Sequence, residues 1–279
     1  MKIKKIEVFP IRVKNNFDIG RKSDTKNINT AMLEIKNLKK TKKEVPAKNK
    51  VEKRNLEPKS LGNYETNIKD MGEYYVDEGS ATSIYSKSHE TTVVKIETEN
   101  GIVGWGEAQS PVSPNTTATI IKDIVEPLTI GKDIYDVESI WHNNYSSKRE
   151  RGHYTGFYID AICGVDIAIW DAIGKSLNMP TCKAMGGAHR KSVAVYNGIG
   201  GTEPEEVADQ AEWSVSKGYK FVKMHLKENL EKDIEIARKV RERVGDSIGI
   251  MIDVHMGFDT FNVIKLGKEL EKLNLLWIE

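Results

Sequence analysis

Between Tyr219 and His255 the chain reads YKFVKMHLKENLEKDIEIARKVRERVGDSIGIMIDVH, and this stretch decides the expected fold. Two apolar runs, Phe221–Leu226 and Ile248–His255, flank the helical segment Asn229–Val244. The pattern predicts a strand, a helix and a second strand. Strands that alternate with helices of this length form βαβ units around a parallel sheet.

The same rhythm begins upstream of this stretch. Ser192–Asn197 has the composition of an apolar strand, and Thr202 with Glu205 predicts a capping box for a helix that runs to about residue 217. The glycine cluster Gly198–Gly201 lies between them. We interpret it as a tight strand-to-helix turn, because one glycine cluster is weak evidence for a phosphate loop.

Downstream, the rhythm continues to the last residue. A third helix is expected over Thr260–Leu273 and a fourth strand over Leu275–Glu279. Helices of this length after every strand favour a (β/α) barrel over a doubly wound sheet, although periodicity alone leaves both open.

The N-terminal half has strands first and helices after them. Residues 2–14 alternate polar and apolar side chains, and strand signals recur over Thr92–Glu99 and Ile102–Ala108. The step Asn100-Gly101 joins the last two runs and is a strong hairpin signal, because both residues tolerate positive φ. Helices are expected over about 115–125, Asp136–Asn144 and Tyr158–Leu177.

A polar region at about residues 20–75 separates these strands. It is crowded with Lys and Asn, as in KNLKKTKKEVPAKNKVEKRN at 36–55, and has no sustained apolar period. Such a segment cannot repay its ordering entropy. A basic arm for nucleic acid is one interpretation, but no aromatic residues are interleaved, and a solvated charge run is the commoner explanation.

The bulk composition narrows the class of protein. Lys and Arg total 42 while Asp and Glu total 41, so no global charge attracts nucleic acid or a membrane. The two cysteines, Cys163 and Cys182, are too few for a disulfide framework and indicate a reducing compartment. The N-terminus lacks the apolar core of a signal peptide, and no run approaches the roughly 20 residues that span a bilayer. We expect a cytoplasmic protein with no nucleic-acid or membrane partner.

Polar side chains interrupt three of the expected strands near their carboxyl ends. With a period of two, Lys223 and His225 share one face of their strand, and Asp253 and His255 share one face of the next. Glu279 ends the fourth strand. Strands of a parallel barrel should be apolar throughout, whereas barrel enzymes place catalytic groups at this end of the strands. We therefore expect these five side chains to surround one mouth.

Each residue alone has a structural explanation. A strand Lys can extend to solvent, a lone strand His is commonly structural, and an Asp after a strand can cap the next helix. Asp259 already caps the helix that starts near Thr260, which weakens that explanation for Asp253. Five polar residues in this order favour a site.

The two carboxylates suggest a metal. Asp253 and Glu279 offer hard oxygen ligands, which suit Mg²⁺ better than zinc. A Mg²⁺ ion can hold a substrate carboxylate and stabilise the second negative charge that develops when the neighbouring C–H loses a proton. Lys223 or His225 could take that proton.

Several motifs occur together in this chain. They are Lys-Met-His at 223–225, Ile-Asp-Val-His at 252–255, Trp-Ile-Glu at 277–279, Gly-Ile-Val-Gly-Trp-Gly-Glu-Ala at 101–108, and the helix Gly164–Lys175 followed by Met-Gly-Gly. Together they resemble the mandelate racemase/muconate lactonizing enzyme branch of the enolase superfamily, over residues 1–15 and about 90–279. The resemblance implies an α+β cap domain and a TIM-like (β/α)₇β barrel.

The resemblance also implies roles for the five residues. Asp253 and Glu279 match the first two of three metal-binding carboxylates, and Lys223 and His225 occupy the two positions of a Lys-x-Lys motif. The His at the second position departs from the racemase pattern. His255 resembles the Asp-x-His of mannonate and galactonate dehydratases, in which the His is the general acid that helps the β-hydroxyl leave.

These matches imply a Mg²⁺-dependent hydro-lyase of carbohydrate acid catabolism. It would convert an aldonate or aldarate to a 2-keto-3-deoxy acid. A racemase or cycloisomerase of the same branch is the alternative. The family's specificity elements would be the loop near Asn16–Arg21 and the hairpin near Glu107–Ser110.

The resemblance divides the chain into an α+β cap domain over 1–125 with the Lys-rich insert, a helical part of the cap over 126–188, and a barrel over 189–279. The barrel part has about 90 residues, against roughly 250 in a complete barrel. We therefore expect the first four strands of a truncated barrel, without the third metal carboxylate. A C-terminal half-barrel polypeptide could complete it, and a complete protein would form a homo-oligomer. The alternative of another class is an inactive fragment or scaffold.

Overall fold

The structure is a computed structural model that describes residues 1–14, 67–78, 82–226 and 230–279. Most of the Lys-rich insert, and the expected specificity loop near Asn16–Arg21, lie outside the described residues. The chain forms two compact units. The first contains mainly residues 1–14, 70–76 and 84–193, and the second mainly residues 194–279.

A three-stranded antiparallel sheet organises the first unit. Its order is β1 (Ile3–Lys14), β5 (Ser88–Thr98) and β6 (Val103–Ala108). The predicted hairpin joins β5 to β6, and Gly101 in its turn has φ 80°. Alternate residues of β5 are buried, as expected for a sheet with one covered face.

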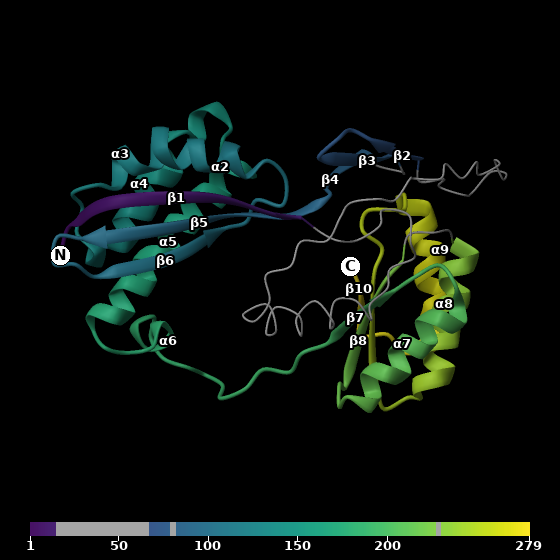
Figure 1. The fold of residues 1–279 in the computed structure, drawn as a ribbon. Coiled ribbons are helices and arrows are strands. Elements are labelled where there is room, and N and C mark those ends of the chain that lie inside the picture. The colour runs from purple at the N-terminus through teal and green to yellow at the C-terminus, as the bar shows by residue number, and fades with distance from the viewer. Residues whose placement is uncertain (15–66, 79–81, 227–229) are drawn as a thin grey trace, which may run out of the picture. The chain divides into compact units, whose positions relative to one another are not determined.

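Helices follow the sheet in the first unit, as the sequence predicts. Figure 1 shows the longest of them, α5, running along the strands. The helical elements are α2 (Pro114–Ile120), η1 (Ile121–Val125), α3 (Glu126–Thr129), η2 (Ile134–Asp136), α4 (Val137–Ser147), η3 (Arg149–Arg151), α5 (Phe157–Ser176) and α6 (Thr181–Ala184). The buried core between α5 and the sheet includes Ile6, Val94, Ile96, Ile162, Val165 and Ile169.

Helix α5 approaches β6 unusually closely. A Cβ atom at Gly104 would lie 2.0 Å from the carbonyl oxygen of Ala168, and a Cβ at Gly106 would lie 2.1 Å from that of Gly164. A Cβ at Gly164 would in turn meet the Cβ of Ala108 at 2.7 Å. Only glycine fits at these three positions, so the glycines of the 101–108 motif and of the helix motif serve one contact.

A second small sheet lies in a region where the sequence predicts no regular structure. It contains β2 (Asn67–Asp70), β3 (Tyr74–Glu78) and β4 (Thr82–Ser86), in that order. The prediction of a polar region without strands to about residue 75 is therefore wrong over its last residues. These strands are only four or five residues long, too short to show a sustained apolar period.

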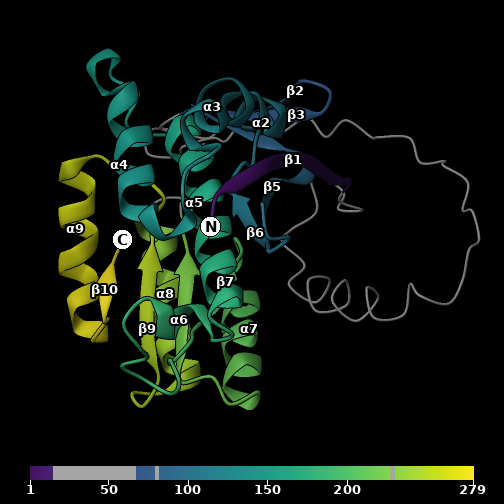
Figure 2. The ribbon, with the colours of Figure 1, turned by 90° about the vertical axis from the view of Figure 1, so that its left-hand side faces the viewer.

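The second unit alternates strands with helices as predicted. Its four strands are parallel, in the order β10-β9-β8-β7, and Figure 2 shows them running side by side. Helices α7, α8 and α9 lie along one side of this sheet (Figure 1). The elements are β7 (Asn197–Gly200), α7 (Pro204–Ser216), β8 (Phe221–His225), α8 (Leu230–Val244), β9 (Gly249–Asp253), α9 (Thr260–Leu270), η4 (Glu271–Leu273) and β10 (Trp277–Ile278).

Two local predictions in this unit are wrong. Ser192–Tyr196 is not a strand, and β7 begins at Asn197, so the glycine cluster forms the strand itself and not the turn after it. The residue before α7 is Glu203, which makes no side-chain cap, so Thr202 and Glu205 form no capping box. The fixed φ of Pro204 in the first turn starts this helix instead.

By contrast, Asp259 caps α9 as predicted, since its Oδ1 accepts from the Asn262 amide at 2.8 Å. The prediction that the four strands are the first half of a truncated barrel stays a prediction. In the described part of the chain, no helix is long and apolar enough to cross a membrane.

Candidate active site

One ammonium group brings together two of the predicted carboxylates at the carboxyl ends of the strands. Lys223 Nζ on β8 lies 3.0 Å from Asp253 Oδ2 on β9 and 2.7 Å from Glu279 Oε2 after β10. Parallel pairing explains this convergence. Lys223 is opposite Met251, which is opposite Trp277, so Asp253 and Glu279 each lie two residues beyond the position that is level with Lys223. The ladder continues to Glu279, whose amide donates to the Ile252 carbonyl at 2.8 Å.

The three charged groups differ in burial. The Lys223 side chain is only 7% exposed and that of Asp253 13%, whereas that of Glu279 is 57% exposed. A buried ammonium is costly unless it is paired, and here two carboxylates pair it. Lys223 is therefore the centre of the cluster, and Glu279 is its solvent-facing member.

The pKa values of Lys223 and Asp253 shift as this arrangement requires. Hydrogen bonds to Glu279 and then Asp253 raise the pKa of Lys223 and outweigh the opposing effect of desolvation. For Asp253, burial raises the pKa, but the hydrogen bonds from Lys223 and from the His255 amide outweigh it. The net pKa of Asp253 is lowered. The cluster therefore holds one cation between two anions.

His225 stands at the edge of this cluster. It pairs with Asp253 in the parallel register, and its Nδ1 lies 3.6 Å from Asp253 Oδ2. This distance is too long for a hydrogen bond, so the carboxylate acts on the ring only through its charge. The His225 side chain is 54% exposed, which leaves the ring accessible to a ligand.

His255 departs from the predicted geometry. Strand β9 ends at Asp253, and His255 and Met256 have φ values of 46° and 58°. The prediction that Asp253 and His255 share one face of a strand is therefore wrong, because the left-handed turn breaks the period of two. The backbone amide of His255 donates a hydrogen bond to Asp253 Oδ1 at 2.8 Å, which fixes the orientation of that carboxylate.

The oxygen atoms in this cluster are of the kind that bind magnesium. Asp253 and Glu279 supply hard carboxylate oxygens that already share one cation, the Lys223 ammonium. Across the described residues, no group of three His, Cys, Asp or Glu side chains is arranged to hold a metal. A Mg²⁺ ion held by these two residues would need further oxygen ligands to complete its octahedral shell.

The structure adds neighbours that the sequence did not predict. The Tyr196 ring lies 5.7 Å from Lys223 Nζ, a cation–π contact. Gly198 pairs with Lys223 and Gly200 pairs with His225 in the β7–β8 register. The alternation Tyr-x-Gly-x-Gly at 196–200 could have indicated that these residues share one face of a strand, but the predicted strand ends at Asn197.

A separate cavity of about 620 Å³ lies in the first unit. It is lined by Glu90, Thr91, Glu107, Gln109, Ser110, Pro111 and Ile167. The hairpin near Glu107–Ser110, expected to set specificity, therefore forms part of its wall. Thr91 Oγ1 fixes Glu107 with a hydrogen bond of 2.6 Å to Oε1.

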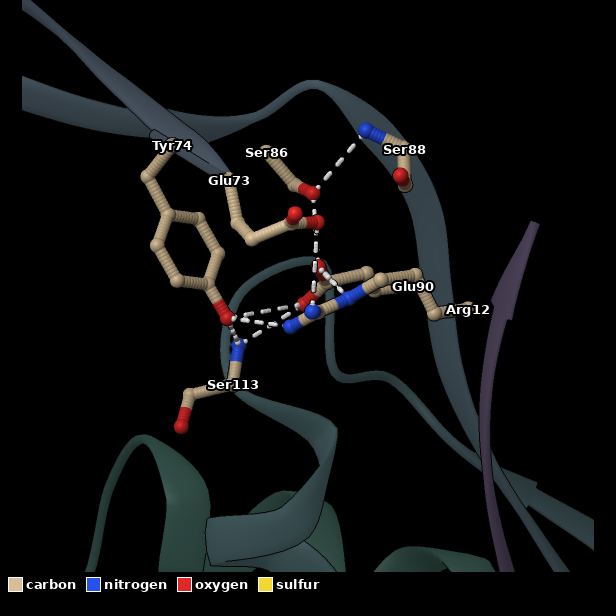
Figure 3. A network of polar contacts seen from close by, with 7 residues as sticks. All are labelled: Arg12, Glu73, Tyr74, Ser86, Ser88, Glu90 and Ser113. Carbon is tan, nitrogen blue, oxygen red and sulfur yellow. Dashed lines mark hydrogen bonds and ion pairs between the residues drawn. The ribbon is translucent and has the colours of Figure 1, made fainter. Parts of the chain in front are cut away.

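Glu90, one of these lining residues, is a buried carboxylate at the centre of a polar network, which Figure 3 shows. Its oxygens accept hydrogen bonds from Arg12 Nε at 2.7 Å, Ser86 Oγ at 2.7 Å and the Ser113 amide at 2.9 Å. Tyr74 OH donates to Glu90 at 3.3 Å and accepts from Arg12 Nη2 at 2.9 Å. Glu90 thereby joins β1, β3, β4 and the start of α2.

Two family models match the chain. The mandelate racemase/muconate lactonizing enzyme N-terminal domain matches residues 77–186, and the enolase C-terminal domain-like model matches residues 206–279.

Similar curated proteins have several activities. An arabinonate dehydratase from Saccharolobus solfataricus is 31% identical over 68% of this chain and 52% of its own length. An N-succinyl-L-Arg/Lys racemase from Bacillus cereus is 32% identical over 67% of this chain and 50% of its own length. A D-galactarolactone cycloisomerase from Agrobacterium fabrum is 30% identical over the same shares. The chain thus spans about half the length of the curated relatives it matches.

Solved structures agree on the fold. A candidate isomerase from Sinorhizobium meliloti superposes with a TM-score of 0.77 at 27% identity, over 100% of this chain and 62% of that one. An enolase superfamily member from Agrobacterium tumefaciens gives a TM-score of 0.75 at 20% identity, over 99% of this chain and 61% of that one.

Proposed function

Because this chain belongs to the mandelate racemase/muconate lactonizing enzyme branch of the enolase superfamily, we propose that it abstracts the proton α to a carboxylate, in the dehydration of a sugar acid. The product would be a 2-keto-3-deoxy acid. The convergence of Asp253 and Glu279 on one cation carries the proposal, since proton abstraction beside a carboxylate needs a charge sink at such a point. The similarity to an arabinonate dehydratase supports the substrate class.

The metal and the charged residues have distinct roles in this proposal. A Mg²⁺ ion held by Asp253 and Glu279 would bind the substrate carboxylate and stabilise the charge left by the departing proton. The Lys223 ammonium already donates to two carboxylates, so it contributes positive charge beside them.

The two histidines divide the proton transfers. The exposed His225 ring takes the α-proton, with its Nδ1 3.6 Å from Asp253 Oδ2. His255 donates a proton to the leaving β-hydroxyl, which departs as water.

A second candidate is racemisation or cycloisomerisation in the same branch. Lys223 and His225 face the same side of β8, so racemisation would also need a proton carrier on the opposite face of the substrate, whereas cycloisomerisation needs only one base. The relatives include a racemase and a cycloisomerase.

A screen of aldonic and aldaric acids with Mg²⁺ tests the choice. Dehydration yields a 2-keto acid detectable with semicarbazide. Epimerised acid without keto acid would instead establish the second candidate.

We also propose that full activity needs the part of the relatives' length that this chain does not match. Leu276 and Trp277, beside and on the edge strand β10, are 50% and 46% exposed. Apolar side chains at a sheet edge are a typical docking surface for a further strand. A polypeptide with the remaining barrel strands, added to the chain, should then raise activity.

A further inference from the structure

Most glycines whose surroundings the structure describes have a physical reason to be glycine. Gly218, Gly245 and several others have φ between 71° and 152°, where other residues are strained. Gly104, Gly106 and Gly249 have ordinary φ, but a Cβ there would lie within 2.5 Å of a neighbouring heavy atom. These glycines are explained by backbone conformation or by packing.

Gly198 has neither reason. Its φ is not in the left-handed region. Apart from Gly198 itself and its two chain neighbours, the only heavy atom of the described residues within 4 Å of a Cβ built there is Nε2 of His225, at 3.9 Å. Its neighbour on the same face, Gly200, differs, because a Cβ at that position would lie 3.3 Å from the His225 carbonyl oxygen. A strand interior disfavours glycine, so a single methyl group at Gly198 would not destabilise the fold and could stabilise it.

The position of Gly198 relative to the cluster is fixed by strand register. It pairs with Lys223 in the parallel ladder, so a side chain there would project on the same face as Lys223 and His225. The Cβ site near the His225 ring agrees with this direction. Among the described residues, the missing side chain thus leaves open space beside the His225 ring, on the face of the sheet that also carries Lys223.

We propose that Gly198 determines specificity: its missing side chain makes room beside Lys223 and His225 for the hydroxylated carbon chain of a long α-hydroxy acid. This inference rests on the proposed function and deepens it. A short α-hydroxy acid such as glycolate has no such chain and does not need the space. A bulkier residue at position 198 should therefore weaken the binding of long acids and leave the binding of short acids almost unchanged.

Binding measurements test this without requiring turnover. Wild type, Gly198→Ala and Gly198→Val are titrated by calorimetry, in excess Mg²⁺, with a panel of hexonates, pentonates and glycolate. We expect the dissociation constant for long acids to rise about 10-fold in Gly198→Ala and about 100-fold or more in Gly198→Val. Glycolate binding should change less than about threefold, and the melting temperature of Gly198→Ala should stay level or rise.

Gly267→Ala is the matched control, since a Cβ there also has open space, with Ile278 Cδ1 at 3.9 Å, but lies on helix α9. It should bind every acid as wild type does. Equal losses for glycolate and long acids in the Gly198 variants, or no loss at all, would overturn the inference while the proposed function stands. Failure of wild type to bind any acid in the panel would count against the proposed function, and the inference would fall with it.

Discussion

The Asp171 carboxylate on α5 accepts a hydrogen bond from the Trp105 amide on β6, with Oδ2 at 2.8 Å from the nitrogen. Strand β6 is an edge strand of its sheet. Lys175, one turn later on α5, donates to the Val103 carbonyl at 3.0 Å and pairs with Asp171. Two side chains of one helix thus satisfy backbone groups of the exposed strand, which protects it from pairing with another chain.

Replacing Asp171 tests this protection. Asp171→Ala removes the acceptor of the Trp105 amide, so we expect a loss of about 1 to 2 kcal/mol in the free energy of unfolding. Asp171→Asn keeps an acceptor and should lose less than half as much. Urea unfolding gives both values. Equal stability of Asp171→Ala and wild type would show that water replaces the carboxylate without cost.

The close contact of α5 with β6 predicts a larger effect. Gly106→Ala places a methyl group within 2.1 Å of the Gly164 carbonyl oxygen, so the helix must move away from the sheet. We expect destabilisation of about 2 to 3 kcal/mol, measured by thermal and chemical unfolding. Gly267→Ala, where the added methyl group has space, is the control and should not destabilise. A Gly106→Ala protein as stable as wild type would contradict the packing described here.

Asp166 on α5 predicts a dependence of stability on pH. Burial, with a smaller effect of Glu138, raises the pKa of Asp166 to about 6. The folded state therefore favours the protonated acid. The contribution of Asp166 to the stability of the folded state is fully present below about pH 4, the pKa of Asp in the unfolded chain. It is lost as the pH rises through about 6. Asp166→Asn should be the more stable protein at pH 7.5, by roughly 1 to 2 kcal/mol after allowance for solvent screening.

The comparison of wild type with Asp166→Asn at pH 4 and pH 7.5 measures this difference. Asp123→Asn, at an exposed residue in the same unit, is the control for removal of one negative charge. A difference that is the same at both pH values would exclude a role for ionisation of Asp166.

Magnesium should stabilise the folded chain through Asp253 and Glu279. A ligand that binds only the native state at 100 times its dissociation constant adds about 2.7 kcal/mol. We expect Mg²⁺ to raise the melting temperature of wild type, and we expect Asp253→Asn and Glu279→Gln to abolish that rise. Asp246→Asn, outside the cluster, should keep it. A rise that survives both substitutions would place the metal elsewhere.

Glu90 predicts the strongest effect of a single charge. Glu90→Gln keeps the shape of the side chain but leaves the Arg12 guanidinium without its buried partner, so we expect a loss of about 3 kcal/mol. Tyr74→Phe removes only a hydroxyl and should lose about 1 kcal/mol. Chemical unfolding distinguishes them. Equal losses would mean that the hydroxyl, and not the charge, holds the network together.

Much of the fold could be predicted from the sequence because strong periodicity survives in it. The hairpin at Gly101, helix α5 and strands β8 and β9 follow from apolar repeats and turn residues. Strand β7 was misplaced because a strand made largely of glycine has no apolar pattern. Strands β2 to β4 are not predicted because strands of four or five residues are too short for a clear period and depend on pairing with their neighbours.

The site could be predicted only in part, for a similar reason. A period of two correctly indicates that Lys223 and His225 lie on one face, and parallel register brings Asp253 beside them. The same period failed at His255, since a positive φ at a non-glycine residue has no signal in its side chain. The open space beside Gly198 cannot be predicted from the sequence, because it depends on which side chains lie around that position in the folded chain.

The ion pairs of Arg12 have a consequence for how this unit can evolve. Arg12, near the end of β1, contacts Glu73, Tyr74 and Glu90, so the place where the chain leaves the sheet is tied to the place where it re-enters. Closing a longer connection between two points that are already fixed costs only about 0.6 kcal/mol for each doubling of its length. The connection between these two points could therefore accept a grafted foreign domain while the sheet and α5 keep their structure.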